Sequence, residues 1–302
     1  MHSLVKRSLE RVLSSSGVGL ISRQRVRGKR LILTYHGVTP EAASPVGERS
    51  LFVAQRDFAA QLDMLSEVAD VAPLDQLDQP GDGRPRIAIT IDDAYRGAVC
   101  QGVSELARRS LPATIFVAPG RLEGQVFWWD ALASPTGTLD LSVREYGLTA
   151  LAGSTERIRD WSARAALCHS DDLPDYARSA TREELHSALA HPGITVGSHT
   201  WSHANIANLT ADEIASEARR SREWIQREFG PKFIAWLAYP YGLASLKAQR
   251  IIASEEYSGA LLCAGGWHES SRVSPFARPR LNVSAGLSLA GLKARILGVG
   301  LS

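Results

Sequence analysis

IAITIDD, at residues 87–93, is the stretch of sequence that decides the fold class. Its first five residues are uncharged and form a run of the right length for one buried strand, and two carboxylates follow at once. In α/β folds the active site lies beyond the carboxyl ends of the strands. The position of Asp92 and Asp93 therefore makes them the first candidates for chemistry.

The same alternation of apolar runs and amphipathic segments continues along the chain. Six further runs predict strands at residues 31–35, 114–117, 194–196, 233–237, 260–262 and 281–283. Helices are predicted between them: one with Phe58, Leu62 and Leu65 on one face, one over residues 103–109, and two that begin just after Thr181 and Thr210, the first residues of two capping boxes. This pattern predicts an α/β fold on a mainly parallel sheet. Periodicity leaves open whether about seven strands close into a barrel or form an open sheet.

Two features interrupt this rhythm. Residues 121–180 carry scattered proline and glycine among short helical pieces, which indicates a helical insertion between two βα units.

Both ends of the chain are basic, because Lys and Arg exceed Asp and Glu by seven over residues 1–30 and by four over residues 276–302. The spaced apolar residues there predict short amphipathic helices, which either lie on an anionic membrane face or pack on their own domain. The expected division is a basic amphipathic segment at 1–30, a catalytic domain at 31–285 and a C-terminal amphipathic helix at 286–302.

Composition and charge exclude several classes of protein. With 302 residues, 44% of them hydrophobic, the chain can bury a full core, and its net charge of +2 disfavours a nucleic-acid binder. Cys100, Cys168 and Cys263 suggest neither a disulfide framework nor a cysteine zinc site, and no apolar run is long enough for a transmembrane helix. Without a recognisable export signal, these features predict a protein of the cytoplasm, either free or bound peripherally at the inner face of the membrane.

A second motif, GSHTWSH at residues 197–203, directly follows a predicted strand. His199 and His203 are four residues apart, and one turn of helix would bring both imidazoles to one side, where they could bind one divalent ion. Together with Asp93 they supply two nitrogen ligands and one oxygen ligand, which leaves positions for water and substrate, as a catalytic site requires. The plainer interpretation is a surface histidine pair, with one aspartate capping a helix and the other solvated.

Two more strand ends carry polar residues. His36 follows the first predicted strand and is either a core histidine or a proton donor, since an imidazole suits protonation of a leaving amine. Tyr241 lies in AYPYG at residues 238–242, where Pro240 and Gly242 predict a tight turn that could aim a backbone N–H at an oxyanion. The plainer interpretation of this turn is an ordinary strand-to-helix connection.

Three motifs, taken in their order along the chain, resemble those of the polysaccharide deacetylase family, carbohydrate esterase family four. They are TIDD at 90–93, HTWSH at 199–203 and YPYG at 239–242. The resemblance spans about residues 31–283. It implies a distorted (β/α) barrel that removes acetyl groups from N-acetylated sugars with a divalent metal, most often zinc. It also implies residue roles: Asp93, His199 and His203 as metal ligands, Asp92 as general base, and the backbone N–H of Tyr241 in the oxyanion hole.

Two departures from the family pattern concern catalytic residues. Ala238 stands where the family has an arginine that pairs with the catalytic aspartate, and Arg280 is the candidate replacement. The family's C-terminal Leu-x-His, which carries its general acid, is absent. The opening Tyr-His strand resembles that of the biofilm poly-N-acetylglucosamine deacetylases, which makes His36 the candidate general acid.

The insertion is the third departure, and it separates Asp93 from His199 by 106 positions. We expect it to shape the substrate groove rather than to alter the chemistry. It contains Trp128 and Trp129, which either contact a glycan or pack with one ring buried and the other half exposed.

These inferences predict a metal-dependent deacetylase that hydrolyses the N-acetyl group of an amino sugar in a surface glycan or in its precursor. One alternative is a glycan-binding relative that has lost turnover, which the missing arginine at Ala238 would explain. The other is a hydrolase of another small amide or ester. The expected partners are an N-acetylated sugar or glycan and, peripherally, a membrane surface, with no nucleic acid.

Overall fold

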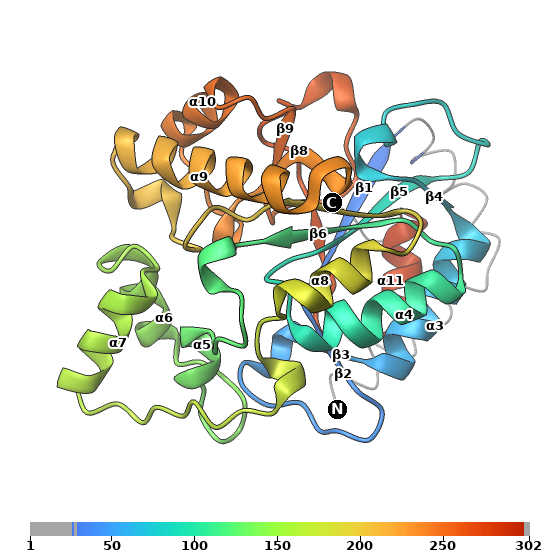
Figure 1. Ribbon diagram of the computed structural model, residues 1–302. Helices are drawn as coiled ribbons and strands as arrows, with labels where there is room; N and C mark the ends of the chain where they lie inside the picture. The colour runs from blue at the N-terminus through green and yellow to red at the C-terminus, as the bar shows by residue number, and fades with distance from the viewer. Residues whose placement is uncertain (1–25, 27–28, 299–302) are drawn as a thin grey trace.

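Eight strands form one sheet in the computed structural model, which describes residues 26 and 29–298 (Figure 1). Along the sheet the order is β10 (Leu281–Asn282), β1 (Arg30–Tyr35), β5 (Arg86–Ile91), β6 (Ala113–Val117), β7 (Ile194–Ser198), β8 (Phe233–Ala238) and β9 (Gly259–Leu261), with β4 (Asp70–Val71) paired to β5 beside this path. Every pairing in this sheet is parallel.

All seven strands expected from the apolar runs are present, and their ends differ from the expectation by one or two residues. The sequence pattern missed β4 and two further strands, β2 (Gly37–Thr39) and β3 (Phe52–Ala54), which form a small separate parallel sheet. Each of these three strands has only two or three residues, so its periodicity does not identify it. β9 and β10 are equally short, but the sequence assigned them from the runs at 260–262 and 281–283.

The two ends of the main sheet meet through the segment just before β10. The N–H of Leu262 donates to the carbonyl of Arg278 (2.9 Å), and the N–H of Arg278 donates to the carbonyl of Ala260 (3.0 Å). These bonds link β9 to the residues that lead into β10, although the two strands do not pair directly. The fold is therefore a distorted (β/α) barrel, which confirms the expected class and resolves the choice between barrel and open sheet.

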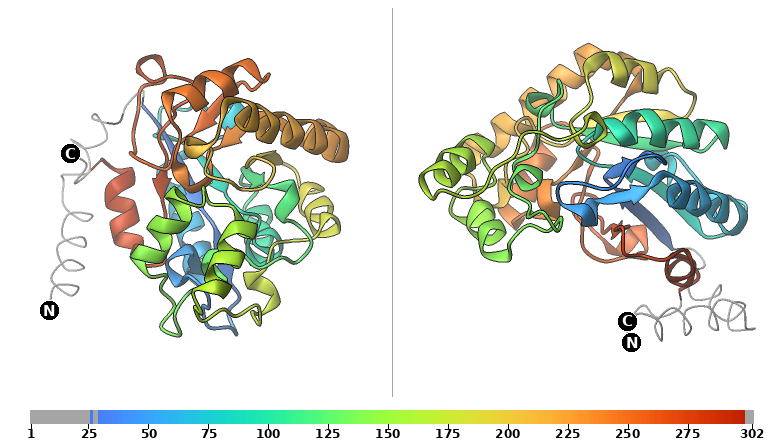
Figure 2. Two further views of the ribbon diagram at one scale, coloured as in Figure 1. Left: turned by 90° about the vertical axis from the view of Figure 1, so that its left-hand side faces the viewer. Right: turned by 90° about the horizontal axis from the view of Figure 1, so that it is seen from below.

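Helices cover the outside of this sheet (Figures 1 and 2). They are α3 (Gln55–Val68), α4 (Val103–Arg108), α8 (Arg182–Leu189), α9 (Ala211–Phe229), α10 (Leu246–Ser254) and α11 (Leu289–Ile296). Both predicted capping boxes are present, with Thr181 and Glu184 starting α8 and Thr210 and Glu213 starting α9. In each box the threonine hydroxyl and the glutamate carboxylate satisfy backbone N–H groups that the helix itself cannot bond.

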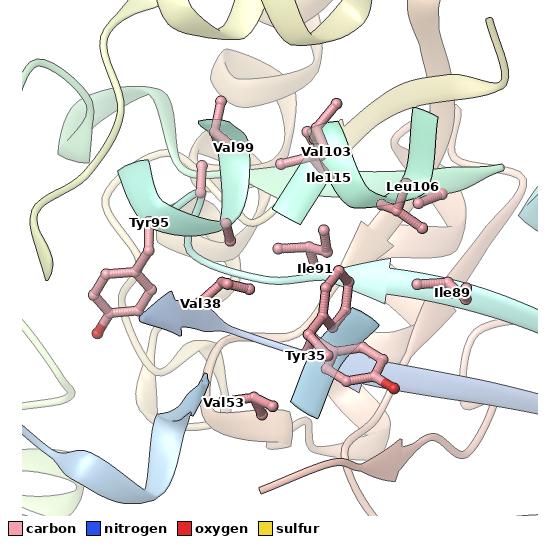
Figure 3. Packing of buried hydrophobic residues seen from close by; sticks show 14 of the residues in the cluster. Tyr35, Val38, Val53, Ile89, Ile91, Tyr95, Val99, Val103, Leu106 and Ile115 are labelled. Atoms are coloured by element: carbon pink, nitrogen blue, oxygen red, sulfur yellow. The ribbon is translucent and has the colours of Figure 1, made fainter. Parts of the chain in front are cut away.

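A core of buried aliphatic and aromatic side chains holds β1 and β5 against the neighbouring helices. Figure 3 shows part of this cluster, including Tyr35 of β1, Ile91 of β5 and Val103 of α4, all three of which are almost fully buried. Because the core fixes both strands in register, from Arg30 opposite Arg86 to Tyr35 opposite Ile91, the polar residues that follow them emerge at the same end of the sheet.

The connection from β6 to α8 holds three short helices, α5 (Trp128–Ala131), α6 (Leu141–Thr149) and α7 (Thr155–Arg164). In Figure 1 they lie together at lower left, apart from α3, α4 and α8. These three helices lie within residues 121–180, the range in which the sequence predicts a helical insertion.

The C-terminal helix α11 packs against α3, and its Leu292 and Ile296 are fully buried. The described part of this basic end thus fits the alternative of a helix packed on its own domain. The predicted N-terminal segment, residues 1–30, lies outside the described residues except for Val26, Lys29 and Arg30. Within the described part of the chain, no helix has the length and apolar composition to cross a membrane.

Candidate metal centre and active site

A pocket opens at the carboxyl ends of β1, β5, β7 and β8. It is lined by six of the seven residues that the sequence singled out: His36, Asp92, Asp93, His199, His203 and Tyr241. The seventh, Arg280, is fully buried and in contact with Asp92. Positions that are up to 244 residues apart in the sequence, His36 and Arg280, therefore belong to one site.

Asp93, His199 and His203 form a buried cluster in this pocket. Their potential ligand atoms all lie within 4.8 Å of one another. Asp93 Oδ1 is 2.9 Å from Nε2 of His203 and 3.4 Å from Nε2 of His199. Burial alone would raise the pKa of Asp93, but the two imidazoles hold it far below its usual value.

These three side chains fit a divalent ion. A carboxylate with two imidazoles is a donor set that zinc and similar ions accept. Asp93 Oδ1 is buried and makes no hydrogen bond of good geometry, so a positive charge there would satisfy it. Nδ1 of His199 is 2.7 Å from the carbonyl oxygen of Ala238, to which it can donate, and this contact turns Nε2 toward the cluster.

The local backbone differs from the expectation of a helical turn. His199 and His203 lie on a loop after β7, and Thr200 and His203 adopt left-handed backbone with φ of 61° and 62°. Asp93 and Tyr241 are left-handed as well, with φ of 68° and 59°. Such strained positions, rare for residues with a Cβ, tend to cluster at functional sites, and here they bring both imidazoles to one carboxylate.

Asp92 has different partners from its neighbour. Both of its oxygens accept hydrogen bonds from the Arg280 guanidinium, Nη1 to Oδ1 and Nη2 to Oδ2, each at 2.7 Å. Burial would raise the pKa of Asp92, but the charge of Arg280 outweighs burial and lowers it. Arg280 also donates to Leu262 O (3.1 Å) and Thr90 Oγ1 (3.2 Å), so three groups hold the guanidinium in place. Arg280 thus pairs with the aspartate for which Ala238 offers no side-chain partner.

His36 follows β1 and lines the same pocket. Burial lowers the pKa of its imidazole, and the charges of Asp93 and Asp92 oppose this effect. A lowered pKa makes the protonated imidazole a stronger acid than a free histidine. Its position suits proton donation to a group bound beside Asp92 and Asp93.

The turn after β8 contains Tyr241, and the phenol of this residue is anchored. Its hydroxyl accepts a hydrogen bond from Trp128 Nε1 (3.0 Å) and donates one to Gly153 O (3.3 Å). The Tyr241 ring stands edge-on to that of His203, with centroids 4.7 Å apart. A tight turn held in this way keeps the backbone of residue 241 in a fixed orientation at the edge of the pocket.

Trp128 and Trp129 are both buried, with 1% and 5% of their surfaces exposed, and both line the pocket. The alternative to glycan contact was one buried and one half-exposed ring, and the structure differs from it. The structure has both buried as pocket walls, and the Trp129 ring lies 4.9 Å from that of His203.

Sequence reasoning missed a buried network behind Trp129. The indole N–H of Trp129 donates to the hydroxyl of Tyr95 (2.8 Å), which donates to Asp130 Oδ2 (2.5 Å), and Asp130 Oδ1 accepts the N–H of Glu48 (2.8 Å). Burial raises the pKa of Asp130 to about 8. The adjacency of Asp130 to the two tryptophans in FWWD was the one signal available, and it does not identify distant partners such as Tyr95.

Five further residues of the pocket lining were not anticipated: Leu51, Arg144, Leu148, Cys263 and Asn282. Arg144 and Leu148 come from α6 and are one helical turn apart. The insertion therefore contributes directly to the pocket, as expected of a segment that shapes a substrate groove.

A family model and several solved structures resemble this chain. The model of the polysaccharide deacetylase family matches residues 80–260, more than half of the chain. No curated protein sequence matches it.

Three solved structures are similar in fold. PplD, a deacetylase of Streptococcus pyogenes in complex with acetate, is 16% identical with a TM-score of 0.61, and the match covers 89% of this chain and 98% of that chain. BC0361, a polysaccharide deacetylase from Bacillus cereus, is 15% identical with a TM-score of 0.63, covering 89% and 69%. IcaB from Ammonifex degensii is 18% identical with a TM-score of 0.61, covering 89% and 97%. At these identities the likeness concerns the fold.

Proposed function

The chain belongs to the polysaccharide deacetylase family, and on that premise we propose that it is a metal-dependent hydrolase that removes the acetyl group from an N-acetylated amino sugar in a surface glycan or its precursor. One observation carries the proposal: a buried Asp93–His199–His203 cluster lies beside an aspartate that is held by a buried arginine. Asp92 Oδ2 is 4.0 Å from Nε2 of His199, so a base and a metal-binding cluster share one pocket.

In this proposal Asp93, His199 and His203 hold a divalent ion, most suitably zinc. When bound, the ion supplies Lewis-acid chemistry at the acetamide carbonyl and makes the attacking water more acidic. The metal content of the purified protein, measured by elemental analysis, tests both the presence and the identity of the ion.

The remaining steps belong to side chains and backbone of this chain. Asp92, kept ionised by Arg280, accepts the proton of the attacking water. The N–H of Tyr241 donates to the oxyanion that forms on the carbonyl oxygen. His36 then donates a proton to the departing nitrogen, so that the products are acetate and the amine of the sugar.

The alternative of a glycan-binding relative without turnover rested on the missing arginine at Ala238. Arg280 supplies a guanidinium to Asp92 from another part of the chain, which removes the reason for that alternative. Hydrolysis of another small amide or ester would use the same groups, and a panel of substrates distinguishes it.

The test is release of acetate from N-acetylated glucosamine oligomers, measured before and after chelation and after metal is restored. Activity should disappear with the chelator and return with the metal. His203→Ala should remove both bound metal and activity, whereas His186→Ala, a half-exposed histidine of α8 outside the pocket, should change neither. Full activity in chelator, or full metal occupancy in His203→Ala, would contradict the proposal.

We also propose that basic residues of the N-terminal segment hold the protein at the inner face of the membrane. The support is the excess of seven positive charges over residues 1–30, since anionic lipid attracts basic residues near its surface. Cell fractionation tests this location. Salt-extractable protein on the inner face would support it, and protein found outside the cytoplasmic membrane would contradict it.

A further inference from the structure

Arg144 is a cation in the wall of the pocket that the proposed mechanism does not use. It lies on α6 of the insertion and lines the same pocket as Asp92 and His203. Among the described residues its guanidinium has no hydrogen-bond or ion-pair partner. Two other arginines of the same region do have carboxylate partners: Arg121 pairs with Glu156, and Arg159 pairs with Asp171.

With the proposed divalent ion held at Asp93, neither carboxylate of the pocket is left free to pair with Arg144. The carboxylate of Asp92 is neutralised by the bidentate Arg280 pair, and that of Asp93 is held by two imidazoles. A bound divalent ion would add positive charge to the same space. The mouth of the pocket is therefore positive and suits a negatively charged ligand.

A neutral polymer of N-acetylated sugars carries no anionic group with which the Arg144 guanidinium could pair. Moreover, deacetylation creates an ammonium group, and a glycan that already carries several of them would be repelled by Arg144. A guanidinium instead matches a phosphate or carboxylate, because its planar array of donors can bind two oxygens at once.

We propose that Arg144 binds an oxyanion of the substrate, so that the preferred substrate is an N-acetylated sugar carrying a phosphoryl or carboxylate group close to the acetamide. This inference rests on the proposed function and names its substrate class. The oxyanion has two chemical sources, a phosphoester on the sugar itself or the carboxylate of a neighbouring uronic acid. The Arg144 guanidinium would bind either oxyanion, so the experiment below distinguishes the two sources.

Binding is measured by calorimetry with the metal-loaded full chain carrying Asp92→Asn, which prevents turnover. The probes are N-acetylglucosamine 1-phosphate methyl diester, a disaccharide of glucuronic acid and N-acetylglucosamine, and neutral diacetylchitobiose. At least one anionic probe should bind about tenfold or more tightly than the neutral one. The anionic probe that binds more tightly identifies the source of the oxyanion.

Adding Arg144→Gln should abolish this preference while leaving the affinity for diacetylchitobiose unchanged. Arg164→Gln, an exposed arginine of the same insertion that does not line the pocket, is the matched control and should preserve the preference. The proposal is overturned if neither anionic probe is preferred, or if the preference survives Arg144→Gln, which would assign it to the metal or to Arg280, whose carboxylate partner is removed by Asp92→Asn.

Turnover distinguishes this inference from the function on which it rests. In the chain with Asp92 intact, Arg144→Gln should raise KM for the preferred anionic probe about tenfold and change kcat little, with the neutral substrate unaffected. If no probe releases acetate but the Arg144-dependent binding preference persists, the proposed deacetylation fails and the anion site stands. If acetate is released equally well from neutral and anionic probes by both proteins, the deacetylase stands and the anion site fails.

Discussion

Asp92 and Asp93 are adjacent in the sequence, yet each has its own set of partners. Left-handed backbone at Asp93 turns its carboxylate toward two imidazoles, while Asp92 continues from β5 toward the guanidinium of Arg280. A carboxylate held by imidazole nitrogens is suited to a cation, and one held by an arginine is suited to remain ionised and accept a proton. The division of roles between the two aspartates therefore depends on their neighbours rather than on the motif.

The first residue-scale prediction separates these roles. Asp92→Asn should leave the metal content unchanged and lower kcat at least a hundredfold, because an amide fills the same space but accepts no proton. Asp93→Asn should lower the metal content itself. Metal analysis and acetate release on the same preparations check both results, and exchanged phenotypes would reverse the assignment of base and ligand.

A second prediction concerns Arg280. Its charge lowers the pKa of Asp92, so the carboxylate is ionised from a lower pH than an ordinary aspartate. The stability that this ion pair contributes is present above the pKa of the unfolded residue and is lost as the pH falls through the folded value. Arg280→Gln should therefore move the acidic limb of the kcat/KM profile to higher pH, and it should destabilise the fold by about 3–5 kcal/mol, since it leaves a buried charge unpaired.

Arg280→Lys is the conservative variant. It should move the acidic limb of the kcat/KM profile less far than Arg280→Gln does, because lysine keeps the charge but loses the bidentate geometry. Arg278→Gln is the matched control. Arg278 is a nearly buried arginine two positions away that pairs with Asp78 and does not line the pocket. An unchanged acidic limb in Arg280→Gln would mean that Arg280 does not act on the catalytic base.

Spacing and strand-end position singled out six pocket residues, because these features are local in the sequence. Arg280 was proposed only through the family resemblance, as the replacement for the arginine missing at Ala238. The prediction of a helical turn for His199 and His203 was wrong. Spacing of four residues is shared by a helix and by this loop, and the left-handed φ of Thr200 and His203 has no sequence signal without glycine. Arg144 was missed for a different reason: nothing in the sequence of the insertion shows which helix face meets a pocket built from other strands.

At the scale of elements, the short helix α5 holds the wall of the pocket in place. Asp130 is 98% buried and ties α5 to the Glu48 backbone and, through Tyr95, to the segment that follows Asp93. Gly47 leaves room for the Asp130 carboxylate, because a Cβ at residue 47 would lie 2.4 Å from Asp130 Oδ1. The elements around the Asp93–His199–His203 cluster are thus connected by a buried polar network as well as by apolar packing.

The prediction at this scale is a pH-dependent stability due to Asp130. Its pKa is raised to about 8, chiefly by burial and also by the charges of Asp93 and Glu48, while the Tyr95 hydroxyl opposes the shift. A carboxyl whose pKa is raised binds its proton more tightly when folded, so stability falls as the pH rises from about 4 toward 8, by about 1.4 kcal/mol per unit.

Asp130→Asn cannot ionise and should remove this slope from the free energy of unfolding. Denaturant titrations between pH 5 and pH 8 measure it, with the exposed Asp160→Asn of α7 as the control that keeps the slope of the parent protein. Parallel stability curves for the parent and Asp130→Asn would show that Asp130 stays ionised in the fold.

At the scale of the whole molecule, the site depends on closure of the sheet. β10, near the C-terminus, pairs with β1, which pairs with β5, and this order brings Arg280 to Asp92 across 188 positions of sequence. The apolar runs predicted nearly all of these strands, but their order in the barrel follows from pairing across the whole chain. Composition and periodicity carry no information on that pairing, so the distorted barrel could be expected only from the family resemblance.

The last prediction belongs to this scale, because the proposed ion connects two segments that are distant in sequence: Asp93 follows β5, and His199 and His203 follow β7. A ligand that binds only the folded state stabilises it by about 4 kcal/mol at a free concentration a thousandfold above its Kd. For a domain of this size that corresponds to a rise in Tm of roughly 10 °C. Thermal unfolding of the parent protein should show this difference between the metal-loaded and the chelated form. His186→Ala should show the same difference, and His203→Ala should show little or none. A chelation effect that persists in His203→Ala would place the stabilising metal elsewhere in the molecule.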